Sequence, residues 1–275
     1  MLKFIHMTDI HLTGEDRLLY GISPKDRLDA CFRHIKTHHA DADFVVITGD
    51  IANNGNAEAY RQLHDTAKES GLTVFVIPGN HDDTSNMCQI LPEFSGNLNE
   101  VEAGVWRSSF IISEAGAFVF LDTTSRDTIH GMFDDNRAKI LKDRLTFLNS
   151  PHVFLFMHHP PFEVGIPSMD MIRLLDPEPL YSALAPFKSN IRHIFLGHLH
   201  KTMYGSWRGI PFSVIRSTVH QVSAQYDPHD PDTDPAAIVC CDETPEYSVV
   251  RIGDDQVVCN AERFVENIQT FLWDE

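Results

Sequence analysis

Polar side chains that commonly bind metal ions follow five short apolar segments, each at the point where the segment ends. Continuous apolar runs of this length predict strands of a sheet that is covered on both faces. In open α/β sheets, ligands bind beyond the carboxyl ends of the strands, so these side chains are expected to share one site. The five segments are Lys3–Met7, Phe44–Thr48, Thr73–Ile77, Val153–Met157 and His193–Leu196. The side chains that follow them are Asp9 and His11, Asp50, Asn80 and His81, His158, and His198 and His200.

Two pairs among these residues are separated by a single position. Asp9 and His11 form one pair, and His198 and His200 form the other. In extended chain, side chains two positions apart leave on the same side. Each pair can therefore present both of its members to one metal ion.

Asp50 is placed to serve two metal ions. It follows Gly49, which allows the chain to turn sharply and bring the carboxylate close to the site. A carboxylate has two oxygens and can bridge two cations, whereas the amide of Asn80 offers one neutral carbonyl. We expect Asn80 to bind a single ion.

The donor set is too large for one four-coordinate ion and fits two five- or six-coordinate ions that share Asp50. It combines imidazole and oxygen ligands without thiolate, which suits Fe, Mn, Zn or Co. The predicted ligands are Asp9, His11, Asp50, Asn80, His158, His198 and His200. His81 is one position away from Asn80 and is the candidate general acid.

The order of these blocks resembles the signature of the calcineurin-like metallophosphoesterases, and it spans about two hundred residues. The blocks are Asp9-Ile-His11, Gly49-Asp50, Gly79-Asn80-His81-Asp82, His158 and Gly197-His198-Leu-His200. Three longer segments are similar to the bacterial class III cyclic-nucleotide and glycerophosphodiester phosphodiesterases. They are Ile77-Pro-Gly-Asn-His-Asp-Asp83, Met157-His-His-Pro-Pro161 and Thr218-Val-His-Gln-Val222.

The chain departs from the Ser/Thr protein phosphatases of that family at two places. Asp50 is followed by Ile-Ala-Asn-Asn-Gly instead of Val-Asp-Arg-Gly, and His81 is followed by Asp82 instead of Glu. The resemblance therefore implies a metal-dependent phosphoric diester hydrolase. Its substrates would be small phosphodiesters, either 3′,5′-cyclic nucleotides or glycerophosphodiesters, attacked by a metal-bound hydroxide.

The resemblance also implies how the ligands divide and which side chains bind substrate. One ion would be held by Asp9, His11, Asp50 and His200, and the other by Asp50, Asn80, His158 and His198. Beside His81, the side chains of Asn53 and His220 would orient the phosphoryl oxygens.

The fold implied is a four-layer α/β/β/α sandwich with a β-rich C-terminal cap. Residues 1–202 would form the core, 203–259 a cap or dimerisation segment, and 260–275 a helix that returns to the core. Apolar Leu28, Phe32 and Ile35 recur at helical spacing in the first expected helix. The expected helices are Asp26–His38, Ala57–Ser70, Asn136–Leu148, Met171–Ala185 and Ala261–Phe271. The Pro- and Asp-rich run Tyr226–Pro235 is expected to be an irregular loop.

Composition limits the partners. The chain has 22 Lys+Arg against 39 Asp+Glu, a net charge of −17, and no basic cluster, which disfavours long nucleic acids. Its longest apolar runs are far shorter than the ~20 residues that a membrane span needs. Five cysteines without zinc-finger spacing are typical of a reducing compartment, so a cytoplasmic location without membrane contact is expected. The resemblance implies a homo-oligomer, a dimer or higher.

The other histidines of the chain are not expected to bind metal. His159 precedes Pro160-Pro161 and is expected to brace that turn, and nine further histidines are assigned to the surface or to hydrogen-bonded positions. These nine are His6, His34, His38, His39, His64, His130, His152, His193 and His229.

A phosphomonoesterase or nucleotide hydrolase of the same fold remains the main alternative function. A nuclease lacks a basic track, and a non-catalytic scaffold is expected to have lost ligands that are all present here.

Overall fold

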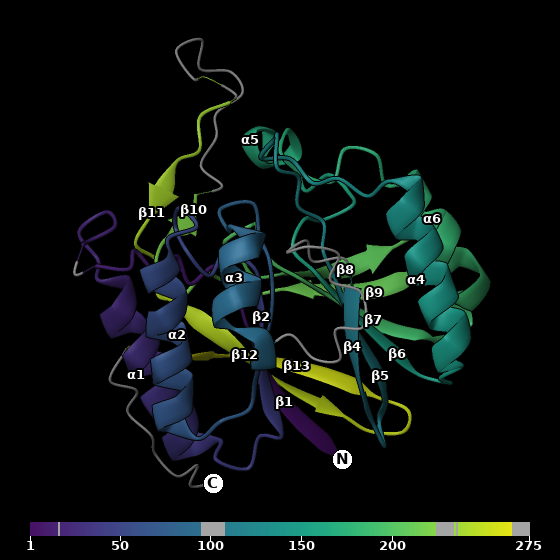
Figure 1. Ribbon diagram of the computed structural model, residues 1–275, viewed down its shortest axis with the longest axis horizontal. Coiled ribbons are helices and arrows are strands. Elements are labelled where there is room, and N and C mark those ends of the chain that lie inside the picture. The colour runs from purple at the N-terminus through teal and green to yellow at the C-terminus, as the bar shows by residue number, and fades with distance from the viewer. Residues whose placement is uncertain (16, 95–107, 224–233, 235, 266–275) are drawn as a thin grey trace, which may run out of the picture.

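Two β-sheets pack face to face, and helices cover the outer face of each. The structure is a computed structural model, and it describes residues 1–15, 17–94, 108–223, 234 and 236–265. In Figure 1 the helices α1, α2 and α3 lie on one side of the paired sheets, and α4 and α6 lie on the other. The predicted α/β/β/α sandwich is confirmed.

The first sheet has five strands in the order β13-β12-β1-β2-β3. Strands β1, β2 and β3 run parallel, and β12 and β13 add an antiparallel pair beside β1. The bounds are β1 Leu2–Met7, β2 Phe44–Thr48, β3 Val74–Ile77, β12 Glu246–Ile252 and β13 Val257–Arg263.

The second sheet has six strands in the order β4-β5-β6-β7-β9-β8. Its central strands β5, β6, β7 and β9 run parallel, and antiparallel partners flank them at both edges. The bounds are β4 Ser108–Ser113, β5 Gly116–Leu121, β6 Val153–Met157, β7 Ile191–Leu196, β8 Met203–Trp207 and β9 Ile210–Val214. A small separate pair contains β10 Gln221–Val222 and β11 Cys240–Cys241.

Phenylalanine rings fill the space between the two sheets. Phe4 of β1 contacts Phe118, Phe156 and Phe195 of the second sheet, with ring centroids 5.3 to 5.9 Å apart. Every residue of β2 and of β6 is buried, as their uninterrupted apolar sequences predict. This interface fixes the two sheets relative to each other and brings their carboxyl ends to the same end of the molecule.

The outer helices begin at side chains that accept hydrogen bonds from the first turn. Ser23, Asn56 and Asp134 cap α1, α2 and α4 in this way, and α2 ends at Gly71 in a left-handed conformation. The buried face of α1 contains Leu28, as its spacing predicts, together with Phe32 and Ile35. The helix bounds are α1 Pro24–His38, α2 Ala57–Ser70, α3 Thr84–Ile90, α4 Asp135–Leu148, α5 Pro167–Asp170 and α6 Glu178–Leu184, with 3₁₀ turns at Pro92–Phe94 and Ala185–Asn190.

One predicted helix is wrong over half its length. The segment Met171–Ala185 contains a helix only from Glu178 onward, and its first seven residues are irregular. Pro177 and Pro179 lack the backbone N–H that a continuing helix needs, and the residue before a proline is disfavoured in helical conformation. A helix can therefore begin there but cannot pass through.

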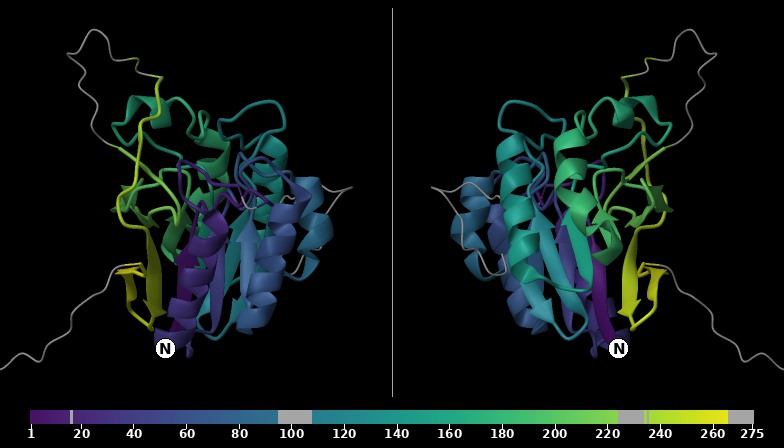
Figure 2. Two further views of the ribbon diagram at one scale, coloured as in Figure 1. Left: turned by 90° about the vertical axis from the view of Figure 1, so that its left-hand side faces the viewer. Right: turned by 90° about the vertical axis from the view of Figure 1, so that its right-hand side faces the viewer.

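The expected cap segment, residues 203–259, is smaller than predicted. Strands β8 and β9 complete the second sheet, and β12 with the first three residues of β13 completes the first, so these parts belong to the core. Within the described part of this segment, the β10–β11 pair stands beyond the core, at the end that carries the ligand residues (Figure 2).

The predicted C-terminal helix Ala261–Phe271 does not begin where expected, because residues 261–263 continue β13 and pair with β12. Its remaining residues from 266 onward lie outside the described residues. Most of the expected loop Tyr226–Pro235 and His229 lie outside them as well. Among the helices that the structure describes, none is long and apolar enough to cross a membrane.

Candidate metal centre

The predicted ligands meet where the carboxyl ends of strands from both sheets converge. Loops after β1, β2 and β3 approach from the first sheet, and loops after β6 and β7 approach from the second (Figure 1). Backbone bonds tie these loops together, since the amide of Asp9 donates to Gly49 and the amide of Gly197 donates to His158. The site is therefore built from both layers of the sandwich.

Five of the seven predicted ligands have a left-handed backbone. Such a conformation is uncommon for residues other than glycine and costs of the order of 1–3 kcal/mol each. It persists only where the surrounding structure requires it, and it concentrates at functional sites. The five residues and their φ angles are Asp9 (53°), His11 (43°), Asp50 (51°), His198 (73°) and His200 (47°).

Glycines make room for the ligands at the ends of β2 and β3. A Cβ atom on Gly49 would collide with the imidazole of His158, and one on Gly79 would collide with the carboxylate of Asp50. Gly49 also has a φ of 92°, which side chains disfavour. Both positions require glycine because a ligand from a neighbouring loop occupies the space.

One group of donors contains Asp9, His11, Asp50 and His200. A donor atom of each lies within 4.8 Å of those of the others, and all four residues are buried. The Nε2 atom of His200 lies 3.2 Å from Oδ1 of Asp9 and 3.0 Å from Nε2 of His11. This is the set predicted for the first ion.

A second group surrounds the Nε2 atom of His158. Oδ1 of Asn80 lies 3.2 Å from it, and Nδ1 of His198 lies 3.3 Å from it. Oδ2 of Asp50 is 3.4 Å away. These are the four residues predicted for the second ion.

Asp50 belongs to both groups through a single oxygen. Its Oδ2 lies 3.4 Å from Nε2 of His158 and 3.7 Å from Nε2 of His11. The other oxygen, Oδ1, accepts the backbone N–H of His81 at 2.9 Å, which fixes the orientation of the carboxylate. The structure thus places Asp50 between two separate sets of nitrogen donors.

The hydrogen bonds of two histidines show that lone pairs point into the site. Nδ1 of His158 lies 2.8 Å from the carbonyl oxygen of Thr48, and Nδ1 of His200 lies 2.9 Å from that of His220. A carbonyl only accepts, so each Nδ1 carries a proton, and each ring turns its Nε2 inward, where loss of the second proton leaves a lone pair for a metal ion. A backbone carbonyl that orients a ligating histidine in this way is typical of metal sites.

The donor set therefore fits metal ions. Inward nitrogen lone pairs and carboxylate oxygens converge at 3.0 to 3.4 Å, an arrangement of acceptors that a cation satisfies. Nε2 of His198 is buried and has no hydrogen-bond partner among the described residues, which is consistent with an open ligand position. The donors are imidazole and oxygen, as the sequence predicts.

Electrostatics keeps both carboxylates ionised. Burial alone would raise the pKa of Asp9, but His200 beside it lowers that pKa to about 2. At Asp50 burial is likewise outweighed by His158, and the pKa stays well below its usual value. Burial lowers the pKa of His158, yet Asp50 raises it to about 9 overall, and a cation bound here would take the place of that proton.

His81 lies at the exposed edge of the site. Its Nδ1 lies 2.8 Å from the carbonyl oxygen of Asn53, so Nδ1 carries a proton and Nε2 is left for another partner. Its ring approaches that of His11 edge-on, with centroids 4.9 Å apart. Its position beside the ligands is compatible with the predicted acid role.

A cavity of about 180 Å³ opens above the two groups. Asn53, His81 and His220, which the sequence predicts to bind substrate, all line it. Asp9 and His158 lie beneath it and are fully buried. The sequence reasoning missed the residues on its other walls, which are Tyr20, Met169, Ile172, Val222, Ile238 and Cys240.

His159 lies beside this centre, yet its ring nitrogens are already bonded. Its Nδ1 lies 2.8 Å from the hydroxyl of Thr123, and its Nε2 lies 3.3 Å from the carbonyl oxygen of Ile129. Burial holds its pKa well below the usual value, so the ring is neutral. These contacts agree with the expected bracing role.

Asp82 holds the loops after β2 and β3 together, a role that the sequence reasoning did not assign. Its carboxylate accepts the backbone N–H groups of Ile51, Ala52 and Gly79 at 2.9 to 3.1 Å, and the hydroxyl of Tyr60 at 3.0 Å. Burial, and then the charge of Asp50, raises its pKa to about 6. The loops that carry Asp50 and Asn80 are thereby joined.

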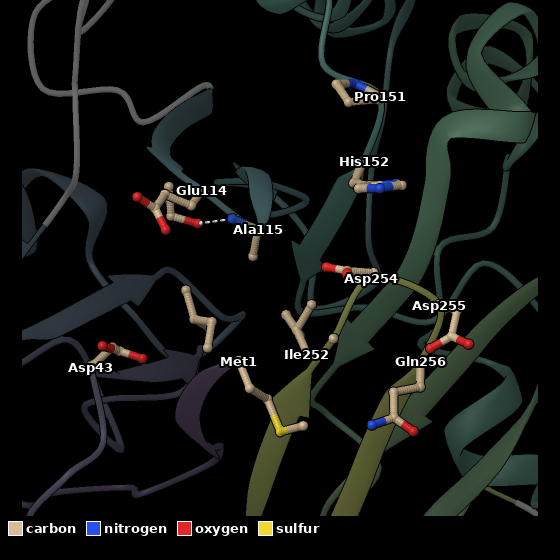
Figure 3. A pocket seen from close by; sticks show the side chains of 13 residues that line it. Met1, Asp43, Glu114, Ala115, Pro151, His152, Ile252, Asp254, Asp255 and Gln256 are labelled. Atoms are coloured by element: carbon tan, nitrogen blue, oxygen red, sulfur yellow. Dashed lines mark hydrogen bonds between the residues drawn. The ribbon is translucent and has the colours of Figure 1, made fainter.

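A larger cavity of about 870 Å³ lies beside the N-terminal end of β1, away from the ligands. Figure 3 shows the side chains around it, among them Asp43, Glu114, Asp254 and Asp255. None of the clusters of potential metal ligands found among the described residues includes a residue of this cavity. The clusters of potential ligands that the structure describes lie instead at the carboxyl ends of the strands.

Two bacterial proteins are similar to this chain over most of its length. A probable cyclic nucleotide phosphodiesterase of Rhodopseudomonas palustris is 31% identical over 266 residues, covering 94% of this chain and 90% of the relative. A probable glycerophosphodiester phosphodiesterase of Arcobacter nitrofigilis is 28% identical over 221 residues, covering 80% and 79%.

A solved structure confirms the fold. A dimetal phosphatase from Danio rerio superposes with a TM-score of 0.70 at 13% identity, covering 97% of this chain and 98% of the other. The sequence model for calcineurin-like phosphoesterases matches residues 2–202, which contain all seven predicted metal ligands. The chain belongs to the calcineurin-like phosphoesterase family.

Proposed function

We propose that the chain is a dinuclear metal-dependent phosphodiesterase that hydrolyses small phosphodiesters, either 3′,5′-cyclic nucleotides or glycerophosphodiesters. The observation that carries this proposal is Asp50, whose Oδ2 lies between His158 and His11 of two donor groups. The relatives named above act by their names on these two substrate classes, which supports the proposal.

Asp9, His11, Asp50 and His200 would hold one ion, and Asp50, Asn80, His158 and His198 would hold the other. Iron, manganese, zinc and cobalt all suit this mixture of imidazole and oxygen donors. When bound, such a pair of ions lowers the pKa of water and neutralises charge on the phosphoryl oxygens.

His81 would supply the proton that the leaving alkoxide needs. Its Nδ1–H is committed to the carbonyl of Asn53, so the doubly protonated ring would release the proton from Nε2. A positioned proton donor contributes about 10²–10⁴-fold to the rate. The side chains of Asn53 and His220 line the same cavity and would orient the non-bridging oxygens.

The side chains that line the cavity support a diester over a monoester. Among the described residues that line it, there is no lysine or arginine. A phosphomonoester carries about one more negative charge than a diester at neutral pH, and no side-chain cation here would pair with it. The overall charge of −17 further disfavours long nucleic acids.

The experiment that tests this function is anaerobic purification, metal analysis and a panel of paired phosphomonoesters and phosphodiesters. We expect about two transition-metal ions per chain and higher kcat/KM for the diester of each pair. The Asp50→Asn variant serves as the control that should lose both metal and activity. Higher kcat/KM for the monoesters would favour the alternative, a phosphomonoesterase or nucleotide hydrolase.

We also propose a cytoplasmic homo-oligomer. The five cysteines are free thiols, which supports a reducing compartment. The outer edge of β13 pairs with no strand among the described residues, and Val258 on it is 45% exposed, which favours contact with a second copy. Light scattering of the purified protein would measure the mass, and a monomer would contradict the oligomer.

A further inference from the structure

Tyr20 occupies a turn that aromatic residues rarely accept. Leu19 and Ile22 exchange two backbone hydrogen bonds of 2.8 and 3.0 Å across Tyr20 and Gly21. Both central residues have positive φ, 53° and 82°, which defines a type I′ turn. Such turns prefer Asn-Gly, and a bulky residue in the left-handed region is strained.

The strained turn holds the Tyr20 ring at the mouth of the cavity. Its side chain is 68% exposed, although large aromatic residues are usually covered. The ring stands edge-on to that of His220 with centroids 4.9 Å apart, and burial, with Cys240 beside it, raises the pKa of the Tyr20 hydroxyl. Strain and exposure together point to a ring that is kept for contact with a ligand.

Four aliphatic side chains line the same cavity as Tyr20. Val222 and Ile238 lie on the β10–β11 side, and Met169 and Ile172 come from α5 and the residues after it. Apart from Asp50, no carboxylate lines the cavity among the described residues. A ligand group placed against these residues meets an aromatic ring and aliphatic side chains. The polar side chains of the cavity are those of the metal ligands and of Asn53, His81, His220 and Cys240.

We propose that Tyr20, Val222, Ile238, Met169 and Ile172 form a subsite for a planar organic group of the substrate, which gives this chain a preference for 3′,5′-cyclic nucleotides over glycerophosphodiesters. The inference rests on the proposed function and narrows it. We call these five residues the base subsite.

The expected preference follows from the chemical group that each substrate would bury in the base subsite. A nucleobase presents a flat π face to an aromatic ring, and such stacking is favourable for every base. A glycerol group presents hydroxyls, and placing hydroxyls against apolar walls without partners costs free energy. The same walls that stabilise a nucleobase therefore disfavour glycerol.

The test compares the Tyr20→Asn variant of the metal-loaded protein with wild type on cyclic AMP and on glycerophosphoethanolamine. Asparagine suits the first central position of a type I′ turn, so the melting temperature is expected to hold or rise. The kcat/KM for cyclic AMP should fall about tenfold or more, mainly through KM, while that for glycerophosphoethanolamine changes little. Leu18→Asn is the matched control, since Leu18 is exposed on the same loop and does not line the cavity.

The outcomes separate this inference from the proposed function. Hydrolysis of both diesters with an equal loss for both in Tyr20→Asn would overturn the base subsite and leave the phosphodiesterase intact. A wild-type preference for glycerophosphoethanolamine would likewise overturn the base subsite and leave the phosphodiesterase intact. Failure to hydrolyse either diester, with turnover of phosphomonoesters instead, would overturn both.

Discussion

The Nδ1 atom of His81 lies 2.8 Å from the carbonyl oxygen of Asn53, a contact that joins the loop after β3 to the loop after β2. The backbone N–H of His81 also donates to Oδ1 of Asp50. The side chain is therefore oriented by one neighbouring loop while its backbone orients the carboxylate shared by both donor groups.

Replacement of His81 by alanine should slow substrates with poor leaving groups far more than substrates with good ones. An alkoxide needs a proton to leave, whereas a nitrophenolate leaves without one. We expect a loss of about 10²–10⁴-fold in kcat for alkyl diesters and a much smaller loss for aryl diesters. Equal losses on both, measured by steady-state kinetics, would remove His81 from the acid role.

Replacement of Asn80 by alanine should empty one of the two metal positions. Its Oδ1 lies 3.2 Å from Nε2 of His158, and it belongs to one donor group only. Metal analysis after dialysis is expected to find about one ion per chain, because the other group keeps all its ligands. Asn54→Ala, at an exposed position near the site, is the control and should keep both ions. Full occupancy in Asn80→Ala would refute the assignment of this ligand.

Strands and helices with a uniform pattern could be predicted from the sequence. The bounds of β2, β6 and α2 match the expected ones at both ends, because their apolar residues are either continuous or follow the helical period. The ligands were found because each follows such a strand. The parallel strands alone bring those ends together, so the ligand set could be predicted without knowing any side-chain contact.

Other parts depend on neighbours that the sequence does not reveal. Residues 261–263 were expected in a helix, yet they form a strand because β12 offers them an open edge. Tyr20 and Asp82 were not assigned roles for a similar reason. The turn of Tyr20 lies beside the cavity only in the folded chain, and Asp82 accepts from four donors in α2 and in the loops after β2 and β3.

Replacement of Asp82 by asparagine should destabilise the protein and weaken metal binding. Each oxygen of Asp82 accepts two hydrogen bonds, and an amide would turn a donor toward two of those four groups. Urea unfolding of the metal-free protein at pH 8, where the carboxylate is ionised, should show a loss of about 2–3 kcal/mol. Tyr60→Phe removes one hydrogen-bond donor to Asp82 and should lower the free energy of unfolding by less. Wild-type stability in Asp82→Asn would contradict the role of Asp82 in joining the loops after β2 and β3.

Two buried histidines should make stability depend on pH. His193 of β7 donates or accepts a 2.9 Å hydrogen bond with Ser213, and His6 of β1 has one of 2.9 Å with Thr48. Burial lowers the pKa of His193 to about 4 and, together with His193, that of His6 to about 3. Below pH 6.5 the unfolded chain binds protons at these positions while the folded chain does not, so stability falls as the pH drops from about 6.5 to about 4.

Replacement of His193 by glutamine should flatten that dependence, because the variant has no group there to protonate on unfolding. The loss for wild type at this one position reaches about 3 kcal/mol near pH 4, and the variant should lack it. The measurement is urea unfolding at pH values between 4 and 7.5. His38→Gln, an exposed histidine, is the control and should retain the wild-type slope. Parallel curves for wild type and His193→Gln would show that His193 becomes protonated in the folded protein without penalty, contrary to its burial between the strands.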